Sequence, residues 1–372
     1  MRITTENPVR VGIVGLSARG GWAPRSHLPA LRRLPGYELL ALAASSPESA
    51  RAAGAAYGIP RAYGSAGDLV ADPDVDLVVV SVRVPLHREV ILAALAAGKA
   101  VFSEWPLGNG LAEAEELAAA AEAAGVRTFA GLQARTAPAV RYVRDLLAEG
   151  YAGEVLSTSL IASGRRWGPS FEPGADYLLD RDNGGTLLTI PFGHTVDALT
   201  AALGEFTEVA AVTATRRRTV HEEGTGRAAA MTAPDQLALS GVLESGAVAS
   251  LHFRGGLARA TTFHWEVNGT DGDLVVTGDH GHLQQARLTV RGARGEEAAV
   301  RELPVPARYF DVPELDDVRD EVPYNIGVQY ERILRDLRAG TRTVPDFAHA
   351  ARRQRLLDAI ERSAATGARV AP

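Results

Sequence analysis

The residues best suited to move a proton lie in the middle of the chain. His194 is followed three positions later by Asp197, a spacing that places both side chains on one face of a helix. Histidine titrates close to neutral pH and can shuttle protons, and Tyr177 offers a hydroxyl in the turn-rich stretch before Asn183-Gly-Gly. We interpret His194 and Tyr177 as candidate catalytic residues. The alternatives are a buried histidine that only holds a hydrogen bond and an ordinary loop tyrosine.

A glycine turn near the N-terminus indicates a second kind of chemistry. The segment Gly15-Leu-Ser-Ala-Arg-Gly20 follows a β-branched run that begins at Val9 and precedes a helical pattern. Such a turn directs backbone N–H groups and the positive end of the next helix at a pyrophosphate. Ser17 stands where the middle glycine is usual. In this position we favour a dinucleotide site at Gly15, Ser17 and Gly20 over an ordinary strand-to-helix loop.

The end of the second apolar run indicates which dinucleotide is bound. A site for NAD places Asp or Glu on the ribose hydroxyls roughly 20 residues after the turn. Here the run ends in Ala44-Ser45-Ser46, with Arg51 one turn further on and no acid at the strand end. A 2′-phosphate would meet no repulsion, and Ser45, Ser46 and Arg51 could bind it. We therefore predict NADP(H), with NAD(H) as the alternative; serines that cap the next helix are compatible with either.

Strands and helices must alternate to position these residues in the first half of the chain. Apolar, strand-like runs occupy residues 9–15, 37–44, 76–82, 100–103 and 127–132. Helical patterns lie between them at residues 28–34, 47–57, 87–97 and 111–124. This alternation predicts a doubly wound parallel sheet, a Rossmann domain over residues 1–135.

The second half changes to neighbouring strands with few helices. Strand-like runs lie at residues 154–162, 207–216, 236–243, 248–254 and 262–267, and helices are predicted at 186–203, 325–339 and 347–366. We expect an α+β substrate and oligomerisation domain over residues 136–372, with a large, mostly antiparallel open sheet and a C-terminal helix at 347–366. Residues 221–232 and 292–320 are predicted loops.

Composition excludes several classes of function. The chain has 372 residues, 39 Lys+Arg against 45 Asp+Glu, a formal net charge of −6 and no cysteine. Disulfides, a thiolate nucleophile and zinc-thiolate or iron–sulfur sites are therefore excluded. The acidic balance, the polar start at Met1–Pro8 and the absence of an apolar run near ~20 residues argue against nucleic-acid and membrane partners and favour a cytoplasmic protein. Asp279-His-Gly-His282 lacks a metal-ligand spacing, so no metal is predicted.

Several motifs, taken in order, carry a family resemblance. They are the Gly15–Gly20 turn, Ser81-Val-Arg-Val-Pro-Leu-His87, Glu104-Trp-Pro106, and Asn183-Gly-Gly185 followed by His194 and Asp197. Over essentially its whole length the chain resembles the glucose–fructose oxidoreductase/inositol dehydrogenase (Gfo/Idh/MocA) family. Within that family it looks most like the branch that contains the fungal galactose-regulon repressor.

The resemblance implies a nicotinamide cofactor and a sugar-like small molecule. It implies further cofactor contacts at Ser81, His87, Glu104, Trp105 and Pro106. It implies substrate contacts at Trp105, Arg135, Asn183 and Asp197. Members of the family commonly associate through the open face of the second-domain sheet, which implies a homodimer or homotetramer.

Two departures from the family pattern bear on catalysis. The usual Glu-Lys-Pro has become Glu104-Trp105-Pro106, and the acid usually found four residues before the histidine has become Ile190. Lys99, the single lysine, precedes a strand and is expected at the edge opposite the ligand. Two hypotheses follow. One is an oxidoreductase of sugars, cyclitols or related polyhydroxy carbonyls that works without the family lysine. The other is a catalytically inactive, cofactor-binding sensor that acts by protein–protein contact.

Overall fold

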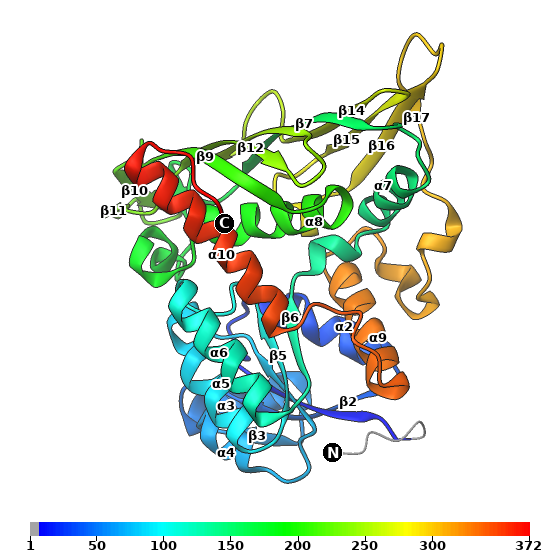
Figure 1. Ribbon diagram of the computed structural model, residues 1–372. Helices are drawn as coiled ribbons and strands as arrows, with labels where there is room; N and C mark the ends of the chain where they lie inside the picture. The colour runs from blue at the N-terminus through cyan, green and yellow to red at the C-terminus, as the bar shows by residue number, and fades with distance from the viewer. Residues whose placement is uncertain (1–6) are drawn as a thin grey trace. The chain divides into compact units, whose positions relative to one another are not determined.

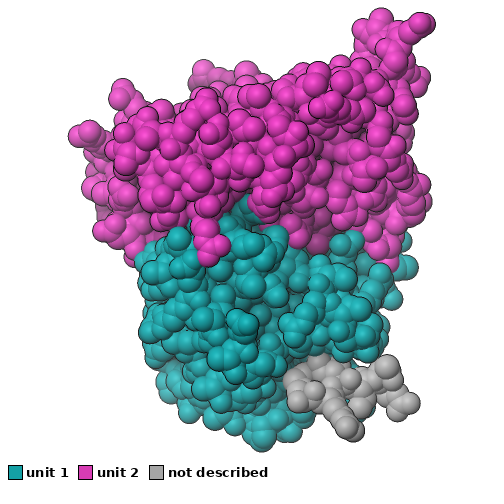
Figure 2. Space-filling model, viewed as in Figure 1, with its two compact units in different colours: residues 1–133, 312–354 teal, residues 134–311, 355–372 magenta. Residues whose placement is uncertain are grey.

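The computed structural model describes residues 7–372 (Figure 1), and the chain divides into two compact units (Figure 2). Unit 1 comprises Met1–Gln133 and Val312–Gln354, and unit 2 comprises Ala134–Asp311 and Arg355–Pro372. The predicted division after residue 135 assigned 312–354 to the second domain, whereas this segment packs within unit 1. Residues 1–6 of the polar start lie outside the described residues. Over residues 7–372 no helix is both long and apolar enough to cross a bilayer.

Unit 1 is built on a six-stranded parallel sheet, which confirms the predicted doubly wound architecture. The strand order is β3-β2-β1-β4-β5-β6. The strands are β1 (Val9–Val14), β2 (Tyr37–Ala43), β3 (Arg61–Tyr63), β4 (Leu77–Val80), β5 (Ala100–Glu104) and β6 (Thr128–Gly131). Strand β4 is buried along its whole length, as expected for a central parallel strand that is covered on both faces.

The helices of unit 1 connect these strands. They are α1 (Trp22–Arg25), α2 (His27–Arg33), α3 (Pro47–Tyr57), α4 (Ala66–Ala71), α5 (His87–Ala96), α6 (Leu111–Ala124) and α9 (Pro323–Ala339). Helices α2 and α9 lie side by side, although some 300 residues separate them in the sequence (Figure 1). Helix α10 spans Phe347–Thr366, and its residues are shared between the two units.

Unit 2 is built on an eight-stranded sheet that is mostly antiparallel, as predicted. Its order is β17-β16-β15-β14-β7-β13-β12-β9, and among these described strands β7 and β13 form the one parallel pair. The strands are β7 (Val155–Gly164), β9 (Phe206–Ala214), β12 (Gln236–Leu243), β13 (Val248–Gly255), β14 (Phe263–Gly269), β15 (Gly272–Gly278), β16 (Leu288–Arg294) and β17 (Arg301–Glu302). Burial alternates along β13, so one face of the sheet faces the core and the other faces solvent.

A second, three-stranded sheet corrects the prediction of a loop at residues 221–232. It has the order β11-β10-β8, with β8 at Ser170–Phe171, β10 at Thr219–Glu222 and β11 at Ala228–Ala230. The turn-rich sequence that suggested a loop is a hairpin turn. Gly224 and Gly226 adopt positive φ there, which lets the chain reverse between β10 and β11.

Two helices of unit 2 lie against one face of the large sheet (Figure 1). Helix α7 spans Pro138–Ala148 and starts with its proline in the first turn. Helix α8 spans Gly193–Leu203. The predicted helix began at residue 186, but residues Leu188–Phe192 form a π-helical turn, called η5. Pro191 has no N–H to donate, so a regular α-helix is not continuous through this segment.

Candidate functional site

The glycine turn after β1 has the geometry of a phosphate cradle. Gly15 adopts φ +100°, and a Cβ on it would lie 2.4 Å from the carbonyl oxygen of Ser81. The Ser81 N–H donates to the carbonyl of Val14, so the ends of β1 and β4 meet directly beneath the turn. Only glycine fits at position 15, because any side chain would collide with the backbone of the neighbouring strand.

The turn presents unsatisfied donors. Within the described residues the N–H groups of Leu16, Ser17 and Ala18 donate to no protein acceptor. Ser17 is held in place, because its carbonyl accepts from the Tyr57 hydroxyl at 2.9 Å and its Oγ accepts from the N–H of Arg19 at 3.2 Å. A cradle of open amide donors is the environment that a pyrophosphate requires.

A short helix, α1, precedes the helix predicted at residues 28–34, which the structure confirms as α2. Helix α1 has only four residues, and Ser26, with φ −120°, separates it from α2. The positive end of a long helix therefore contributes little here, and the backbone amides of the turn are the main donors. Positions 20 and 21 are open: both glycines have positive φ, and a Cβ on either would meet no atom within 4 Å. The residues present thus fit a dinucleotide.

The end of β2 carries the residues predicted to select the dinucleotide. Ser46 caps α3, and its Oγ accepts from the N–H of Ser49 at 3.1 Å. This serine therefore has the helix-capping role that the sequence left open. Ser45 is exposed. Arg51 is also exposed, and within residues 7–372 it forms no hydrogen bond or ion pair. The Arg51 guanidinium, one turn into α3, is therefore open to an anion from solvent.

The end of β5 carries the segment that departs from the family pattern. Glu104 Oε1 accepts from Gln133 Nε2 at 2.7 Å, and the carboxylate side chain is 12% exposed. Trp105 is 4% exposed, and Pro106 is buried. The indole therefore lies in a packed environment, and its proposed contact with cofactor or substrate stays a prediction.

His87 is buried, and its ring nitrogens face backbone carbonyls. It is 1% exposed, and its Nε2 and Nδ1 lie 3.1 Å and 3.3 Å from the carbonyl oxygens of Val82 and Leu107. Burial lowers the pKa of this imidazole, so the ring is neutral at physiological pH. It ties the loop after β4 to the loop after β5. The predicted cofactor contact at His87 would have to act through these loops, since both ring nitrogens face the backbone.

A buried polar network in unit 1 was missed from the sequence. The His27 ring on α2 is 0% exposed; its Nδ1 lies 2.6 Å from the Tyr330 hydroxyl and its Nε2 3.1 Å from Glu104 Oε1. Burial raises the pKa of the Tyr330 hydroxyl well above its ordinary value, so Tyr330 stays protonated. His27 and Tyr330 are 303 positions apart, and no local pattern signals such a contact.

Lys99 lies where the sequence placed it, before β5 and away from the glycine turn. Its ammonium donates to the carbonyls of Asp72 and Val75 at 2.7 Å and 2.8 Å, just before the start of β4. This is the amino end of the parallel strands, whereas the glycine turn lies at the carboxyl end. Lys99 is thus a structural residue.

In unit 2 the Asn183-Gly-Gly segment shapes the surroundings of Tyr177. Asn183 Nδ2 donates to the carbonyl of Tyr177 at 2.9 Å, so the amide predicted to touch substrate orders the loop. Gly184 has φ +70°, and a Cβ on Gly185 would lie 2.9 Å from Leu178 Cδ2. The two glycines let the chain turn and pack against the short helix η3, Asp176–Leu179, that carries Tyr177.

His194 lies near the start of α8 and is 1% exposed. Its ring centroid is 5.2 Å from that of His282, and His282 is 6.5 Å from His280. Burial, followed by the neighbouring His194, His280 and Arg166, lowers the pKa of His282 well below its ordinary value. In the sequence, Asp279–His282 was interpreted only as a possible metal motif, and its packing against His194 was not predicted. Within residues 7–372 no three side chains of suitable type gather to hold a metal ion.

Arg135 and Asp197, both predicted substrate contacts, bind each other. Arg135 Nε donates to Asp197 Oδ2 at 2.8 Å and Nη2 to Oδ1 at 3.3 Å. The Asp197 carboxylate is 0% exposed. The guanidinium thus neutralises a buried charge that would otherwise be costly. A direct ligand contact by either side chain stays a prediction.

The fold and the glycine turn define a Rossmann-type dinucleotide-binding protein with an added α+β unit. Residues 9–132 match a family model described as "Oxidoreductase family, NAD-binding Rossmann fold", and residues 138–278 match one described as "Gal80p, C-terminal domain". The chain belongs to the Gfo/Idh/MocA family of NAD-binding oxidoreductases.

Relatives of known name include both enzymes and a regulator. The dehydrogenase aclE of Aspergillus oryzae is 42% identical over 211 residues, which are 55% of this chain and 57% of that protein. The 1,5-anhydro-D-fructose reductase of Ensifer adhaerens is 31% identical over 81% of this chain and 85% of its own. A crystal structure of a super-repressor mutant of Gal80p from Saccharomyces cerevisiae superposes with a TM-score of 0.87 at 25% identity, covering 98% of this chain and 97% of that one.

Proposed function

We propose that the protein is an NADP(H)-preferring oxidoreductase that acts on a sugar, a cyclitol or a related polyhydroxy carbonyl. The observation that carries the proposal is the turn after β1, in which three consecutive amides face no protein acceptor and Gly15 cannot carry a side chain. A bound nicotinamide dinucleotide supplies a hydride acceptor or donor. Relatives that are named as a dehydrogenase and as a sugar-derivative reductase support the substrate class.

The preference for NADP(H) rests on the charge around the end of β2. Ser45 and Arg51 are exposed, Arg51 has no protein partner in the described chain, and no carboxylate stands at the end of the strand. A 2′-phosphate would gain charge-assisted hydrogen bonds from the guanidinium and the serine hydroxyl. The ribose hydroxyls of NAD(H) would find no carboxylate at the strand end to accept their hydrogen bonds.

We assign the transfer of the hydroxyl proton to His194 or Tyr177. Positioned acid–base groups contribute about 10²–10⁴-fold to such a step. The family lysine is replaced by Trp105, and Lys99 is held at the opposite end of the parallel strands. An indole N–H cannot serve as a general acid or base, so the proton must use another side chain.

Substitution of Arg51 tests the choice of cofactor. We expect Arg51→Ala to weaken NADPH binding about tenfold or more, because a charge-assisted contact contributes roughly 1.5–3 kcal/mol. NADH binding should change less than about twofold. Both affinities are measured by fluorescence of the reduced cofactor. Arg88→Ala is the matched control, since Arg88 pairs with Glu116 on the exposed surface of the same unit. Tighter binding of NADH than of NADPH by the native chain would reject the preference.

Turnover with a panel of keto-sugars tests the chemistry. We expect His194→Gln to lower kcat by about 10²-fold or more while the affinity for NADPH is retained. Tyr177→Phe separates the two candidates, because it removes only the hydroxyl. If His194→Gln retains full kcat, the proton-transfer role passes to Tyr177, and retention in both variants contradicts the assignment.

A regulatory protein is the second candidate, and the environment of Trp105 favours it. The residue in place of the family lysine is 4% exposed and cannot carry a proton, and Ile190 stands at the place of the family acid. The similarity to Gal80p, named as a galactose/lactose metabolism regulatory protein, agrees with a sensor that binds cofactor and contacts other proteins. Tight NADPH binding without oxidation across a broad keto-sugar panel would establish this candidate over the enzyme.

A further inference from the structure

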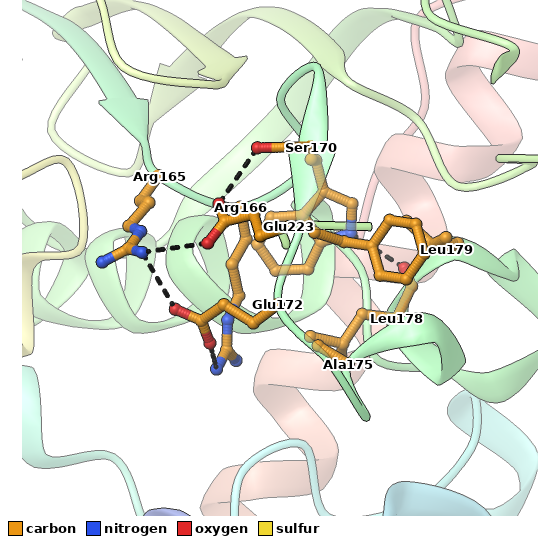
Figure 3. Close-up of a pocket in the computed structure, with 10 residues that line it drawn as sticks. Arg165, Arg166, Ser170, Glu172, Ala175, Leu178, Leu179 and Glu223 are labelled. Carbon is orange, nitrogen blue, oxygen red and sulfur yellow. Dashed lines mark hydrogen bonds and ion pairs between the residues drawn. The ribbon is translucent and has the colours of Figure 1, made fainter. Parts of the chain in front are cut away.

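The buried network of Tyr330, His27 and Glu104 in unit 1 is incomplete. Around the pocket of unit 2 the charged side chains pair with one another, as Arg165 does with Glu223 at 3.5 Å (Figure 3). In unit 1, by contrast, His27 Nε2 is buried and lies 3.1 Å from Glu104 Oε1, yet within the described residues it makes no hydrogen bond of good geometry. A buried ring nitrogen without a well-aligned partner is uncommon and indicates a functional role.

The tyrosine hydroxyl fixes the position of the proton on the His27 ring. Tyr330 stays protonated, and its hydroxyl oxygen lies 2.6 Å from His27 Nδ1. A carboxylate can only accept, so one arrangement suits both neighbours: the hydroxyl donates to Nδ1, and the imidazole proton on Nε2 faces Glu104. Contacts of this kind hold a histidine in one tautomer and one orientation. His27 therefore presents a donor to the carboxylate.

The network holds Glu104 by one of its two carboxylate oxygens. Gln133 Nε2 donates to Oε1 at 2.7 Å, and His27 Nε2 faces the same oxygen. Gly131 leaves room for this bridge, since a Cβ there would lie 2.8 Å from Glu104 Oε1 and 3.0 Å from Gln133 Nε2. Oε2 accepts from no donor in the described part of the chain, and the side chain is 12% exposed. One oxygen thus stays available to a ligand.

The order of the strands places this oxygen on the nicotinamide side of the glycine turn. The turn follows β1 in the order β3-β2-β1-β4-β5-β6, and Glu104 ends β5 at the same carboxyl edge of the sheet. With a pyrophosphate at the turn and the adenosine half over β2, the other nucleoside extends past β4 toward β5. Neighbouring strands lie about 4.8 Å apart, so β5 is roughly 10 Å from β1, within the reach of a nucleoside.

We propose that His27 is a positioning residue for the nicotinamide half of the cofactor and that it acts through Glu104. The carboxylate, held at Oε1 by His27 and Gln133, presents Oε2 to a hydroxyl or amide donor of that half. The inference rests on the proposed function for its cofactor, but it needs neither turnover nor a choice between NADP(H) and NAD(H). A network that only stabilised the fold would not discriminate between the two halves of the cofactor.

Comparison of the whole cofactor with its adenosine half tests the proposal. Titration calorimetry gives the dissociation constants of NADPH and of 2′,5′-ADP, which lacks the nicotinamide nucleoside. His27→Asn keeps a polar group toward Tyr330 and loses the donor toward Glu104, whereas His27→Gln places its amide near the position of Nε2. We expect His27→Asn to weaken NADPH binding about tenfold and 2′,5′-ADP binding less than about twofold. His27→Gln should bind NADPH within about threefold of the native chain.

Tyr330→Phe and Tyr37→Phe provide a second, matched pair. Each removes one buried hydroxyl, but the Tyr37 hydroxyl donates to the backbone carbonyl of Tyr330 at 2.7 Å and does not contact His27. We expect Tyr330→Phe to weaken NADPH about threefold relative to 2′,5′-ADP, because the hydroxyl no longer holds the His27 proton on Nε2. Tyr37→Phe should leave this ratio unchanged. Urea denaturation shows that each variant is folded.

Several outcomes would overturn the positioning role. They are equal weakening of NADPH and 2′,5′-ADP by His27→Asn, no weakening of either, His27→Gln no better than His27→Asn, or equal ratios for the two tyrosine variants. Native binding of NADPH no tighter than that of 2′,5′-ADP would also overturn it. If the native chain prefers NADH, the ratio of NADH to AMP is measured instead.

The same variants separate this inference from the proposed function. A selective loss of NADPH affinity in His27→Asn, in a protein that oxidises no NADPH with any keto-sugar, would overturn the proposed enzyme and leave the positioning role standing. Turnover by the native chain together with an unchanged ratio in His27→Asn would overturn the positioning role and leave the enzyme standing.

Discussion

At the scale of residues, the three histidines of unit 2 show how packing changes what a side chain can do. His282 is packed 5.2 Å from His194, and the backbone N–H of His282 donates to His280 Nδ1 at 2.9 Å. Arg166 adds a further positive charge near His282. Burial first, and then the neighbouring His194, His280 and Arg166, lower the pKa of His282 well below its ordinary value. The His282 ring is therefore neutral near neutral pH.

The lowered pKa values of these buried histidines predict a dependence of stability on pH. The pKa of His282 is well below its ordinary value, and burial also lowers the pKa values of His280 and His87. Above a pH of about 6.5 neither the folded nor the unfolded chain protonates these rings. Below it the unfolded chain takes up protons that the folded chain does not, so the free energy of unfolding falls as the pH drops. The loss is at most about 1.4 kcal/mol per pH unit for each histidine.

Urea denaturation at pH 7.5, 6.5 and 5.5 measures this effect. We expect His282→Gln to make the fall in the free energy of unfolding less steep between pH 6.5 and 5.5. His221→Gln serves as the control, since His221 is exposed and lies outside the histidine group. Equal slopes for native and His282→Gln chains would contradict the assignment of the low pKa to His282.

At the scale of elements, the strand-to-helix turn after β1 was predicted well because its requirements are local. A β-branched run followed by glycines at fixed spacing indicates the turn without knowledge of the rest of the chain. The hairpin of β10 and β11 was predicted as a loop for the opposite reason. Its strands of four and three residues are too short to show a period of two, and they form because they pair with each other and with β8.

Two glycines of the turn after β1 provide a matched pair of substitutions. Both adopt similar φ, +100° at Gly15 and +97° at Gly20, so alanine is strained by roughly 1–2 kcal/mol at either position. Only at Gly15 would the new Cβ also collide with the backbone of Ser81. We expect Gly15→Ala to lower the free energy of unfolding by clearly more than Gly20→Ala and to weaken NADPH binding, because β1 and β4 must separate. Equal losses in the free energy of unfolding, measured by urea denaturation, would contradict this expectation. They would show that the Ser81 backbone does not hinder a side chain at position 15.

At the scale of the whole molecule, the open face of the eight-stranded sheet has unusual chemistry for an exposed surface. Val212, Ala238, His252 and Ile161 form one row across β9, β12, β13 and β7. Val212 is 67% exposed and Ile161 41%. A flat face of small and apolar side chains is typical of a surface that is covered by another chain. We propose that it joins copies of this protein as a homodimer or homotetramer.

Light scattering coupled to size-exclusion chromatography tests this association. Ile161→Glu would place a charge in the middle of the face, and burying an unpaired charge costs several kcal/mol. We expect the dissociation constant to rise about a hundredfold or more, which yields monomers at micromolar concentration. Leu257→Glu is the control, because Leu257 is 60% exposed but lies in the loop beyond the end of β13. A native chain that is monomeric at high concentration, or an Ile161→Glu chain that stays associated, would contradict the proposal.

The sequence by itself determined the alternating elements of unit 1, the glycine turn and the absence of an acid at the very end of β2. These features depend on neighbouring residues and on local periodicity, which a single sequence contains. That Trp105 stands in place of a lysine follows only from the resemblance to the family. Only the tertiary structure decided which charged groups neutralise each other, as Arg135 does with Asp197. It decided, too, that His282 packs beside His194. It also decided that residues 312–354 complete the first unit and that His27 meets Tyr330. Such contacts join segments far apart in the chain, and they form because the packing of apolar faces brings those segments together.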